Sequence, residues 1–327
     1  MKVLCISQEQ VESLGIPVSQ VMRVVEEGWV LKGQKKIEMP AKIGIHPRQD
    51  CFIHAMPCWL GGDVDAAGIK WVAGYPINQA AGLPYITGIM VLNESQTGFV
   101  KAIMDANWIT AWRTGAASGV CAKHMADPDS ETIAVIGLGV QGRTNTVALL
   151  EALPKVKTIK VYDNFPGQVE KYTDFITPFL KGAMIVPCST VQETVKDADV
   201  VVTCTPIVAN PQRFVRAEWL KEEMLAIAVD YDSAFDADVM TNATAFVCDD
   251  LHQYLWTQEH GVYFQEGYPK EEQITGDMGQ VCAGLVKPSK KGRRGAVLMG
   301  IASHDVMTAR LILEKAAAKN VGTTVDL

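Results

Sequence analysis

The sequence predicts an α/β protein in which a doubly wound parallel sheet, with helices on both faces, is joined to an α+β domain. From residue 132 onward, short apolar strands alternate with helices, as at 133–136, 158–162 and 199–204. Alternation with connections of this length is typical of a parallel sheet. In the first hundred residues, strand patterns instead follow one another closely, which indicates a largely antiparallel sheet.

Composition limits the classes of function. The 327 residues suffice for two domains, and 48% hydrophobic with 20% charged residues is ordinary for a soluble globular enzyme. The net charge of −7 argues against a nucleic-acid partner, and the short basic run 290–294 predicts a solvated loop. No leader or membrane span is recognisable, and eight scattered cysteines without metal-ligand spacing fit a reducing cytoplasm.

The most informative stretch runs from residue 132 to residue 163. An apolar strand meets a Gly137-x-Gly139-x-x-Gly142 loop, a helix follows, and a second apolar strand ends on Asp163. Glycines in this order make a tight turn, let the backbone approach a pyrophosphate and let the helix pack on the strand. The helix N-terminus then offers unpaired N–H groups to the phosphates. The stretch therefore predicts a Rossmann-type dinucleotide site, the alternative being a glycine-rich turn in an unrelated α/β domain.

The end of the second strand predicts which dinucleotide is preferred. Asp163 can accept hydrogen bonds from ribose hydroxyls and would repel a 2′-phosphate, and residues 164–166 bring no cation. We therefore expect NAD, with NADP less favoured. Arg143 is the nearest cation that could instead accommodate a 2′-phosphate.

Two cations lie in apolar surroundings of the first domain. Lys70 ends an apolar strand, and Arg113 lies in a helix of small and apolar residues. Together they could clamp a substrate carboxylate, with the planar guanidinium of Arg113 binding it bidentately. The alternative is a pair of surface side chains or internal ion pairs.

Two acids follow the fifth strand of the parallel sheet. Asp230 and Asp232 stand where ligand sites form in open α/β sheets, and such an acid can act as a general base or hold a substrate amine. The alternative for Asp232 is a helix N-cap for a segment that begins at Ala234. Among the histidines, His54 is a stronger candidate than His46 or His304, although a lone histidine is more often structural.

The pattern predicts two domains. The first comprises residues 1–125 and is completed by a C-terminal helix within 300–327; the second comprises 126–299. The predicted helices are 19–33, 107–125, 141–152, 167–180, 190–198, 214–222 and 303–319; the predicted strands of the first domain include 37–45, 50–59, 66–72, 85–93 and 99–104.

Four motifs carry a family resemblance over nearly the whole chain. In order they are Gly68-Ile-Lys-Trp-Val, Gly82-Leu-Pro, Asp105-Ala-x-x-Ile-Thr-Ala-x-Arg-Thr-Gly-Ala and Gly137-x-Gly-x-Gln-Gly. They resemble the ornithine cyclodeaminase/mu-crystallin family. The resemblance implies a homodimer with an α+β substrate-binding and dimerisation domain and a Rossmann domain that binds NAD(H) or NADP(H).

The resemblance also implies roles for individual residues. Lys70 and Arg113 would hold the substrate carboxylate, and Asp232 with Lys70 would be catalytic. Lys42 and His54 would lie at the substrate. The implied cofactor contacts are Arg113, Gly137, Gly139, Val140, Gln141, Gly142, Asp163, Thr203, Thr205, Val229 and Asp230.

Two departures from the family pattern bear on the substrate. Lys42 replaces an arginine, and His54 replaces the acid that would suit a side-chain amine, which argues against ornithine. The leading hypothesis is an NAD(P)-dependent oxidoreductase of a small 2-imino or 2-amino acid. The alternatives are an ornithine cyclodeaminase-type ammonia lyase that uses NAD catalytically and a non-catalytic, mu-crystallin-like binding protein.

Overall fold

The computed structural model describes residues 1–262 and 267–327, which form two compact units. The first unit comprises Met1–Arg113 and Ile301–Leu327, and the second comprises Thr114–Gly300. The division falls within helix α3 (Asn107–Met125), so that this helix contributes residues to both units.

The first unit is built on a mixed sheet that is mostly antiparallel, as predicted. Its strand order is β16-β1-β7-β6-β5-β4-β2, with β3 paired to β4, and β1 and β7 form its parallel pair. The strands are β1 (Lys2–Ile6), β2 (Ile37–Glu38), β3 (Ile43–Ile45), β4 (Phe52–Leu60), β5 (Ala66–Gly74), β6 (Ile86–Asn93), β7 (Val100–Asp105) and β16 (Thr323–Asp326).

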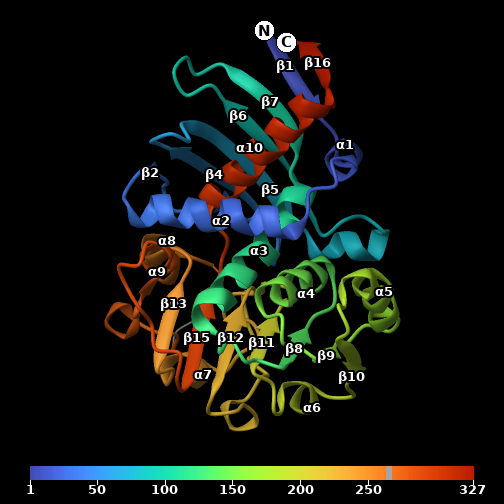
Figure 1. Cartoon of the computed structure of the whole chain (residues 1–327), viewed down its shortest axis with the longest axis vertical. Helices are drawn as coiled ribbons and strands as arrows, with labels where there is room; N and C mark the ends of the chain where they lie inside the picture. Colours follow the sequence, from blue (N-terminus) through green and yellow to red (C-terminus); the bar gives the residue numbers. More distant parts are fainter. Residues whose placement is uncertain (263–266) are drawn as a thin grey trace. The chain divides into compact units, whose positions relative to one another are not determined.

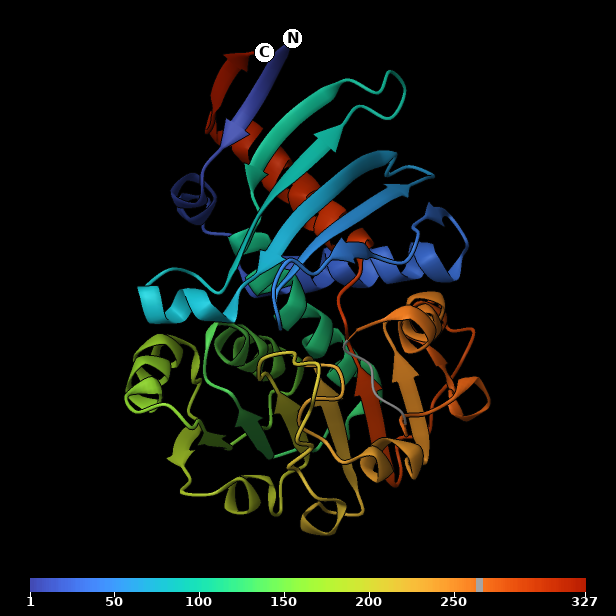
Figure 2. The same ribbon diagram turned by 180° about the vertical axis from the view of Figure 1, so that it is seen from behind.

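One face of this sheet is covered by a long helix, on which a second long helix packs. Helix α10 (Ala302–Lys319) contacts β4, β5 and β6, and α2 (Val18–Gly33) packs on α10. Figure 1 shows α10 in front of the strands, and Figure 2 shows the strands in front of α10. The C-terminal helix thus completes the first unit because its apolar side is buried there, and α1 (Gln8–Ser13) and the short helix η1 (Pro76–Ala81) lie at its margins.

The second unit contains the predicted doubly wound sheet, and all of its strand pairs are parallel. The strand order is β10-β9-β8-β11-β12-β15-β13-β14. The strands are β8 (Thr132–Ile136), β9 (Thr158–Tyr162), β10 (Met184–Pro187), β11 (Val200–Thr203), β12 (Met224–Ala228), β13 (Ala245–Cys248), β14 (Gly276–Asp277) and β15 (Arg293–Val297); the helices are α4 (Val140–Ala152), α5 (Gln168–Ile176), α6 (Val191–Val195), α7 (Ala237–Thr241), α8 (Leu251–His260) and α9 (Met278–Cys282), with short helices η2 (Thr177–Phe179), η3 (Ala217–Trp219) and η4 (Glu271–Gln273).

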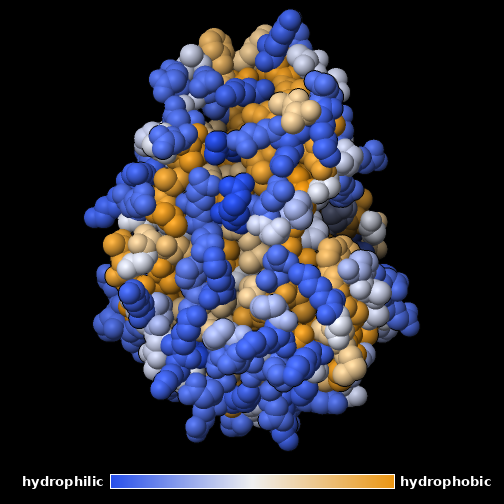
Figure 3. Space-filling model, viewed as in Figure 1, coloured by the Kyte–Doolittle hydropathy of each residue, from blue (hydrophilic) through white to orange (hydrophobic). Residues whose placement is uncertain are grey.

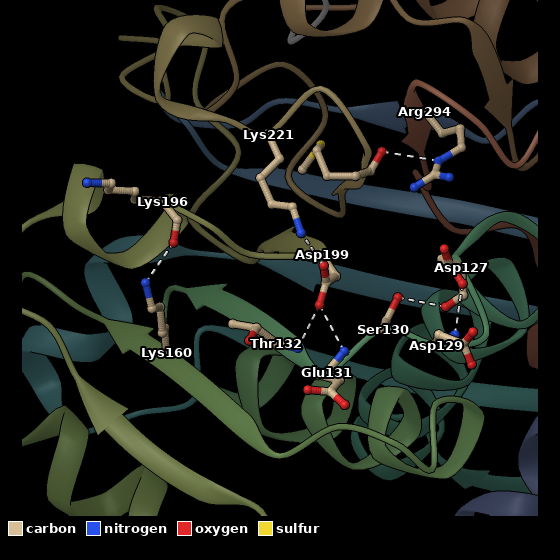
Figure 4. Close-up of polar contacts among 11 residues, drawn as sticks. Asp127, Asp129, Ser130, Glu131, Thr132, Lys160, Lys196, Asp199, Lys221 and Arg294 are labelled. Carbon is tan, nitrogen blue, oxygen red and sulfur yellow. Dashed lines mark hydrogen bonds and ion pairs between the residues drawn. The ribbon is translucent and has the colours of Figure 1, made fainter.

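The prediction of a solvated loop at 290–294 was wrong for the last two of these residues. Residues from Arg293 onward form β15, which lies between β12 and β13 in the interior of the sheet. Arg294 is only 1% exposed, and its Nε donates to the carbonyl of Met224 over 3.2 Å (Figure 4). Its guanidinium also donates to the carbonyl of Lys290, so backbone acceptors compensate the burial of this charge.

Asp199 ties together the starts of three neighbouring strands of the second unit. Its Oδ2 accepts hydrogen bonds from the amides of Glu131 and Thr132 at 2.8 and 2.9 Å, and its Oδ1 pairs with Lys221 (Figure 4). Burial opposes ionisation, but these partners lower the pKa of Asp199 overall. The carboxylate thereby fixes the amino-terminal edge of the sheet.

Two predicted elements differ in the structure. The strand expected at 37–45 is interrupted around Pro40 and becomes β2 and β3, because proline cannot donate a ladder hydrogen bond. The helix expected at 214–222 is reduced to the single turn η3, and Val215 instead forms a bridge with Phe235.

The surface seen in Figure 3 is mostly hydrophilic, with apolar groups between the polar ones. Among the helices of the described residues, none has the length and apolar character needed to cross a membrane.

Candidate active site

Two buried cations of the first unit share one carboxylate oxygen. Lys70, in β5, is fully buried, and its Nζ lies 2.8 Å from Oδ1 of Asp305. Arg113, in α3, donates from Nε to the same oxygen over 2.9 Å. Asp305 lies in the first turn of α10 and is also fully buried. The structure thus brings the two predicted clamp residues together and also pairs them internally, and the Lys70–Arg113–Asp305 cluster carries two cationic groups against one anionic group.

The protonation of Lys70 is finely balanced. Burial is the main reason that the pKa of Lys70 falls to about 7. Arg113 and Lys42 lower this pKa as well, and Asp305 partly offsets them. An incoming anion would therefore stabilise the ammonium form, which makes the cluster suited to a carboxylate.

Lys42 and His54 belong to the same region of the first unit. Lys42 lies between β2 and β3 and is 9% exposed. The ring of His54, in β4, stacks on Phe52 with a centroid distance of 4.3 Å. Burial, followed by Lys42, His46 and Lys70, lowers the pKa of His54 to about 2. His54 is therefore a neutral imidazole and offers no negative charge to a substrate amine.

His304 is a packed core residue. It is fully buried beside Asp305 in the sequence, and its ring meets Trp29 edge-on with a centroid distance of 4.4 Å. Burial, with Arg113 and Lys70 nearby, holds the pKa of His304 well below its usual range.

The glycine loop of the second unit has the geometry that each glycine predicts. Gly137 has a φ of +87°, and Gly142 approaches it so closely that a Cβ would lie 2.1 Å from the Gly137 carbonyl oxygen. Around Gly139, apart from its two chain neighbours, no atom of the described residues lies within 4 Å of the position of a Cβ. Gly139 is the N-cap of α4, which begins at the 59% exposed Val140, so the loop leaves open space before a helix N-terminus.

Asp163 is bonded to the backbone of this loop. Its Oδ2 accepts the amide of Leu138 at 2.7 Å, and its Oδ1 accepts the amide of Phe165 at 2.8 Å. A carboxylate has about four acceptor positions, so these two bonds orient it and leave capacity for hydroxyl donors. Arg143 lies over the ring of Phe175, 5.8 Å from its centroid.

Asp230 joins the carboxyl ends of β11 and β12. Its Oδ1 accepts the hydroxyl of Thr203 at 2.6 Å, and its Oδ2 accepts the amide and hydroxyl of Thr205. Burial nevertheless raises the pKa of Asp230, against the effect of these donors. The backbone amide of Val229 donates to the Thr203 carbonyl over 3.1 Å. Separately, the side-chain amide of Asn145 donates to the backbone carbonyl of Gln141 over 2.8 Å. Four of the predicted cofactor residues thus form one hydrogen-bonded group, namely Thr203, Thr205, Val229 and Asp230, and Gln141 lies on α4.

Asp232 is fully buried and pairs with an arginine that the sequence did not indicate. Nη2 of Arg213 donates to Oδ2 of Asp232 over 2.8 Å. The alternative of an N-cap is wrong, since the next helix is α7, whose N-cap is Asp236. Sequence reasoning missed both Asp305 and Arg213, because neither belongs to a local motif.

The chain is similar to several known proteins over nearly its whole length. The model of the ornithine cyclodeaminase/mu-crystallin family matches residues 1–320. The alanine dehydrogenase of Archaeoglobus fulgidus is 33% identical over 330 residues, 99% of this chain and 98% of the relative. A structure described as an archaeal alanine dehydrogenase dimer with bound NAD superposes with a TM-score of 0.86, at 31% identity and full coverage of both chains. The Delta(1)-pyrroline-2-carboxylate reductase of Thermococcus litoralis, in complex with NADH and L-proline, gives a TM-score of 0.87 at 28% identity and covers 99% of this chain and 100% of its own. The chain belongs to the ornithine cyclodeaminase/mu-crystallin family.

Proposed function

We propose that the protein is an NAD-dependent oxidoreductase that interconverts a small 2-imino acid and the corresponding 2-amino acid. The observation that carries the proposal is the Lys70–Arg113–Asp305 cluster, in which two cations share one carboxylate oxygen. A substrate carboxylate would complete the charge balance and use donors of Arg113 beyond its Nε. The named activities of the alanine dehydrogenase and the pyrroline-carboxylate reductase support the same class of reaction.

The remaining roles follow from chemistry. In the first unit, Lys70 and Arg113 bind and orient the carboxylate, and Lys42 and His54 contact the rest of the substrate. In the second unit, Asp232 stabilises the protonated imine nitrogen or accepts a proton from the amine. NADH, when bound, supplies a hydride to the α-carbon; orientation and electrostatic stabilisation provide much of the rate.

The second unit is proposed to bind the dinucleotide. The pyrophosphate would lie at Gly139 and the N-terminus of α4, where the protein leaves open space, with Val140 and Gln141 beside it. Asp163 would accept the ribose hydroxyls and disfavour NADP. The surrounding loop would be shaped by Gly137, Gly142, Thr203, Thr205, Val229 and Asp230, and Arg113 would also contact the cofactor.

The neutral state of His54 favours net redox chemistry over cyclodeamination. A cyclodeaminase must hold a second, cationic amine of its substrate. His54, stacked on Phe52 and with a pKa of about 2, does not supply the negative charge for this amine. We therefore expect a substrate with a small uncharged side chain.

A screen of 2-keto acids with ammonia or methylamine, and of cyclic imino acids, tests the proposal by following the absorbance of NADH. We expect NADH oxidation with at least one small substrate, and turnover with NADPH should be much slower. Ammonia release from a diamino acid without net redox change would identify a cyclodeaminase instead. NADH binding without any turnover would indicate a binding protein.

A matched pair of lysine variants tests the carboxylate site. Lys70→Ala should abolish most turnover. Lys101→Ala, which removes a half-exposed lysine of β7 that pairs with Glu94, should leave turnover unchanged. Full activity of Lys70→Ala would refute the assignment of Lys70.

A further inference from the structure

Asp232 is held by a side chain from a different loop of the second unit. Nη2 of Arg213 lies 2.8 Å from Oδ2 of Asp232; the Asp232 side chain is fully buried, and that of Arg213 is 18% exposed. A pair this sheltered from solvent is weakly screened, so the guanidinium strongly favours the ionised form of the carboxylate.

The backbone on both sides of the pair adopts an uncommon conformation. Arg213 has a φ of +47° and Tyr231 a φ of +61°, although neither is glycine. The amide of Arg213 donates to the carbonyl of Ser233 over 3.1 Å, which fixes one loop against the other. Left-handed non-glycine residues carry backbone strain, and they cluster at functional sites.

An aromatic ring fixes the guanidinium. Arg213 lies over the ring of Tyr268, 5.0 Å from its centroid, and Tyr268 is 1% exposed. The Tyr268 hydroxyl donates to the carbonyl of Phe235 over 3.0 Å, which orients the ring in turn. Three kinds of contact thus hold Arg213 at Asp232: the ion pair, the ring and the backbone bond.

The other titratable groups around Asp232 do not take over this role. Tyr254 and Tyr268 interact electrostatically with Asp232, but each phenol already donates its proton to a backbone carbonyl. Asp230, two residues away, is bonded to Thr203 and Thr205. Arg213 is therefore the cation that the described part of the chain places on Asp232.

We propose that Arg213 is a positioning residue that orients Asp232 and keeps its carboxylate ionised for the substrate nitrogen. The inference rests on the proposed function, in which Asp232 acts at the α-nitrogen. By occupying Oδ2, Arg213 fixes the plane of the carboxylate, and the carboxylate has about four acceptor positions, so it can still bind an N–H. The negative charge then stabilises a protonated imine, the form that accepts a hydride most readily.

The test compares pH profiles of kcat/KM for the wild type, Arg213→Gln, Arg213→Lys and Arg216→Gln. Arg216 is a matched control, because it lies only three residues after Arg213 and also pairs with an aspartate, Asp236, at 3.0 Å. Its side chain, however, is 49% exposed. In Arg213→Gln the acidic limb should move up by about one to three pH units, because the opposite charge beside Asp232 is lost. Arg213→Lys should keep the limb closer to the wild-type position, and Arg216→Gln should match the wild type.

NADH titrations separate these effects from unfolding. Each variant should bind NADH with a Kd within about twofold of the wild type, a difference well under 1.4 kcal/mol. An Arg213→Gln enzyme with the wild-type acidic limb and kcat would overturn the inference. If Asp232→Asn is inactive while the acidic limb of Arg213→Gln stays at the wild-type position, only the role proposed for Arg213 is refuted. If Asp232→Asn keeps full turnover, the role of Asp232 in the proposed function is refuted.

Discussion

Asp305 pairs with both Lys70 and Arg113. Both cations donate to its Oδ1, although Lys70 is 235 residues away in the sequence. A buried cation without a partner is costly, and one carboxylate stabilises two of them. Burial still lowers the pKa of Lys70 to about 7, and Asp305 partly offsets this fall.

Binding of pyruvate, which has a carboxylate and no amine, should weaken as the pH rises through about 7. The ammonium of Lys70 is present below its pKa of about 7 and is lost above it, so the sign follows from deprotonation. Isothermal titration between pH 6 and pH 9 measures the trend. Lys70→Arg should flatten it, since arginine stays charged; an unchanged slope in this variant would assign the trend to another group.

Asp305→Asn should destabilise the protein by about 3 to 5 kcal/mol, because two buried cations lose their counter-charge. The loss should be greater below pH 7 than above it, because Asp305 raises the pKa of Lys70: at low pH the variant must bury an ammonium without its carboxylate, whereas at high pH it buries a neutral amine. Thermal unfolding at pH 6 and pH 9 tests both statements. Glu314→Gln is the control on the same helix, since Glu314 is 55% exposed and pairs with Arg310, and its Tm should change little.

At the scale of elements, the β8–α4 connection combines two different requirements. Gly142 is needed for the packing of the helix on the loop, whereas Gly139 leaves open space for a ligand. The sequence motif predicts a separate role for each glycine, and the space around the two positions differs accordingly. Substitution by alanine should therefore have different consequences at the two positions.

Gly142→Ala should lower the Tm, because its Cβ would lie 2.1 Å from the backbone oxygen of Gly137. Gly139→Ala should leave the Tm unchanged, since its φ of −68° suits any residue and the space is open. We expect Gly139→Ala to weaken NADH binding by about tenfold or more, as the methyl group would occupy the proposed pyrophosphate position. Unchanged NADH affinity in Gly139→Ala would place the pyrophosphate elsewhere.

At the scale of the whole molecule, the open face of the first sheet indicates how the chain assembles. Lys70 points towards α10, so its neighbour Trp71 points to the opposite face. There, Ile43 on β3, Trp71 on β5 and Ile89 on β6 lie in register, and they are 59%, 45% and 48% exposed. An apolar row of this kind marks an interaction surface, and we propose a homodimer formed through it.

Trp71→Glu should shift the protein from dimer to monomer, because a charge would be buried at the proposed interface. Sedimentation velocity at micromolar concentration measures the change. Leu285→Glu, at a 66% exposed leucine of the second unit, is the control and should sediment as the wild type. A dimeric Trp71→Glu protein would show that another surface mediates assembly.

The sequence by itself determined the fold class, the family, the glycine loop and the cations Lys70 and Arg113. These features are periodic or local, so neighbouring residues suffice to specify them. Only the tertiary structure decided that Asp305 pairs both cations, that Arg213 holds Asp232 and that residues 293–297 lie inside the sheet. The physical reason is that the partner of a buried charge is set by how distant segments pack, which no periodicity along the chain encodes.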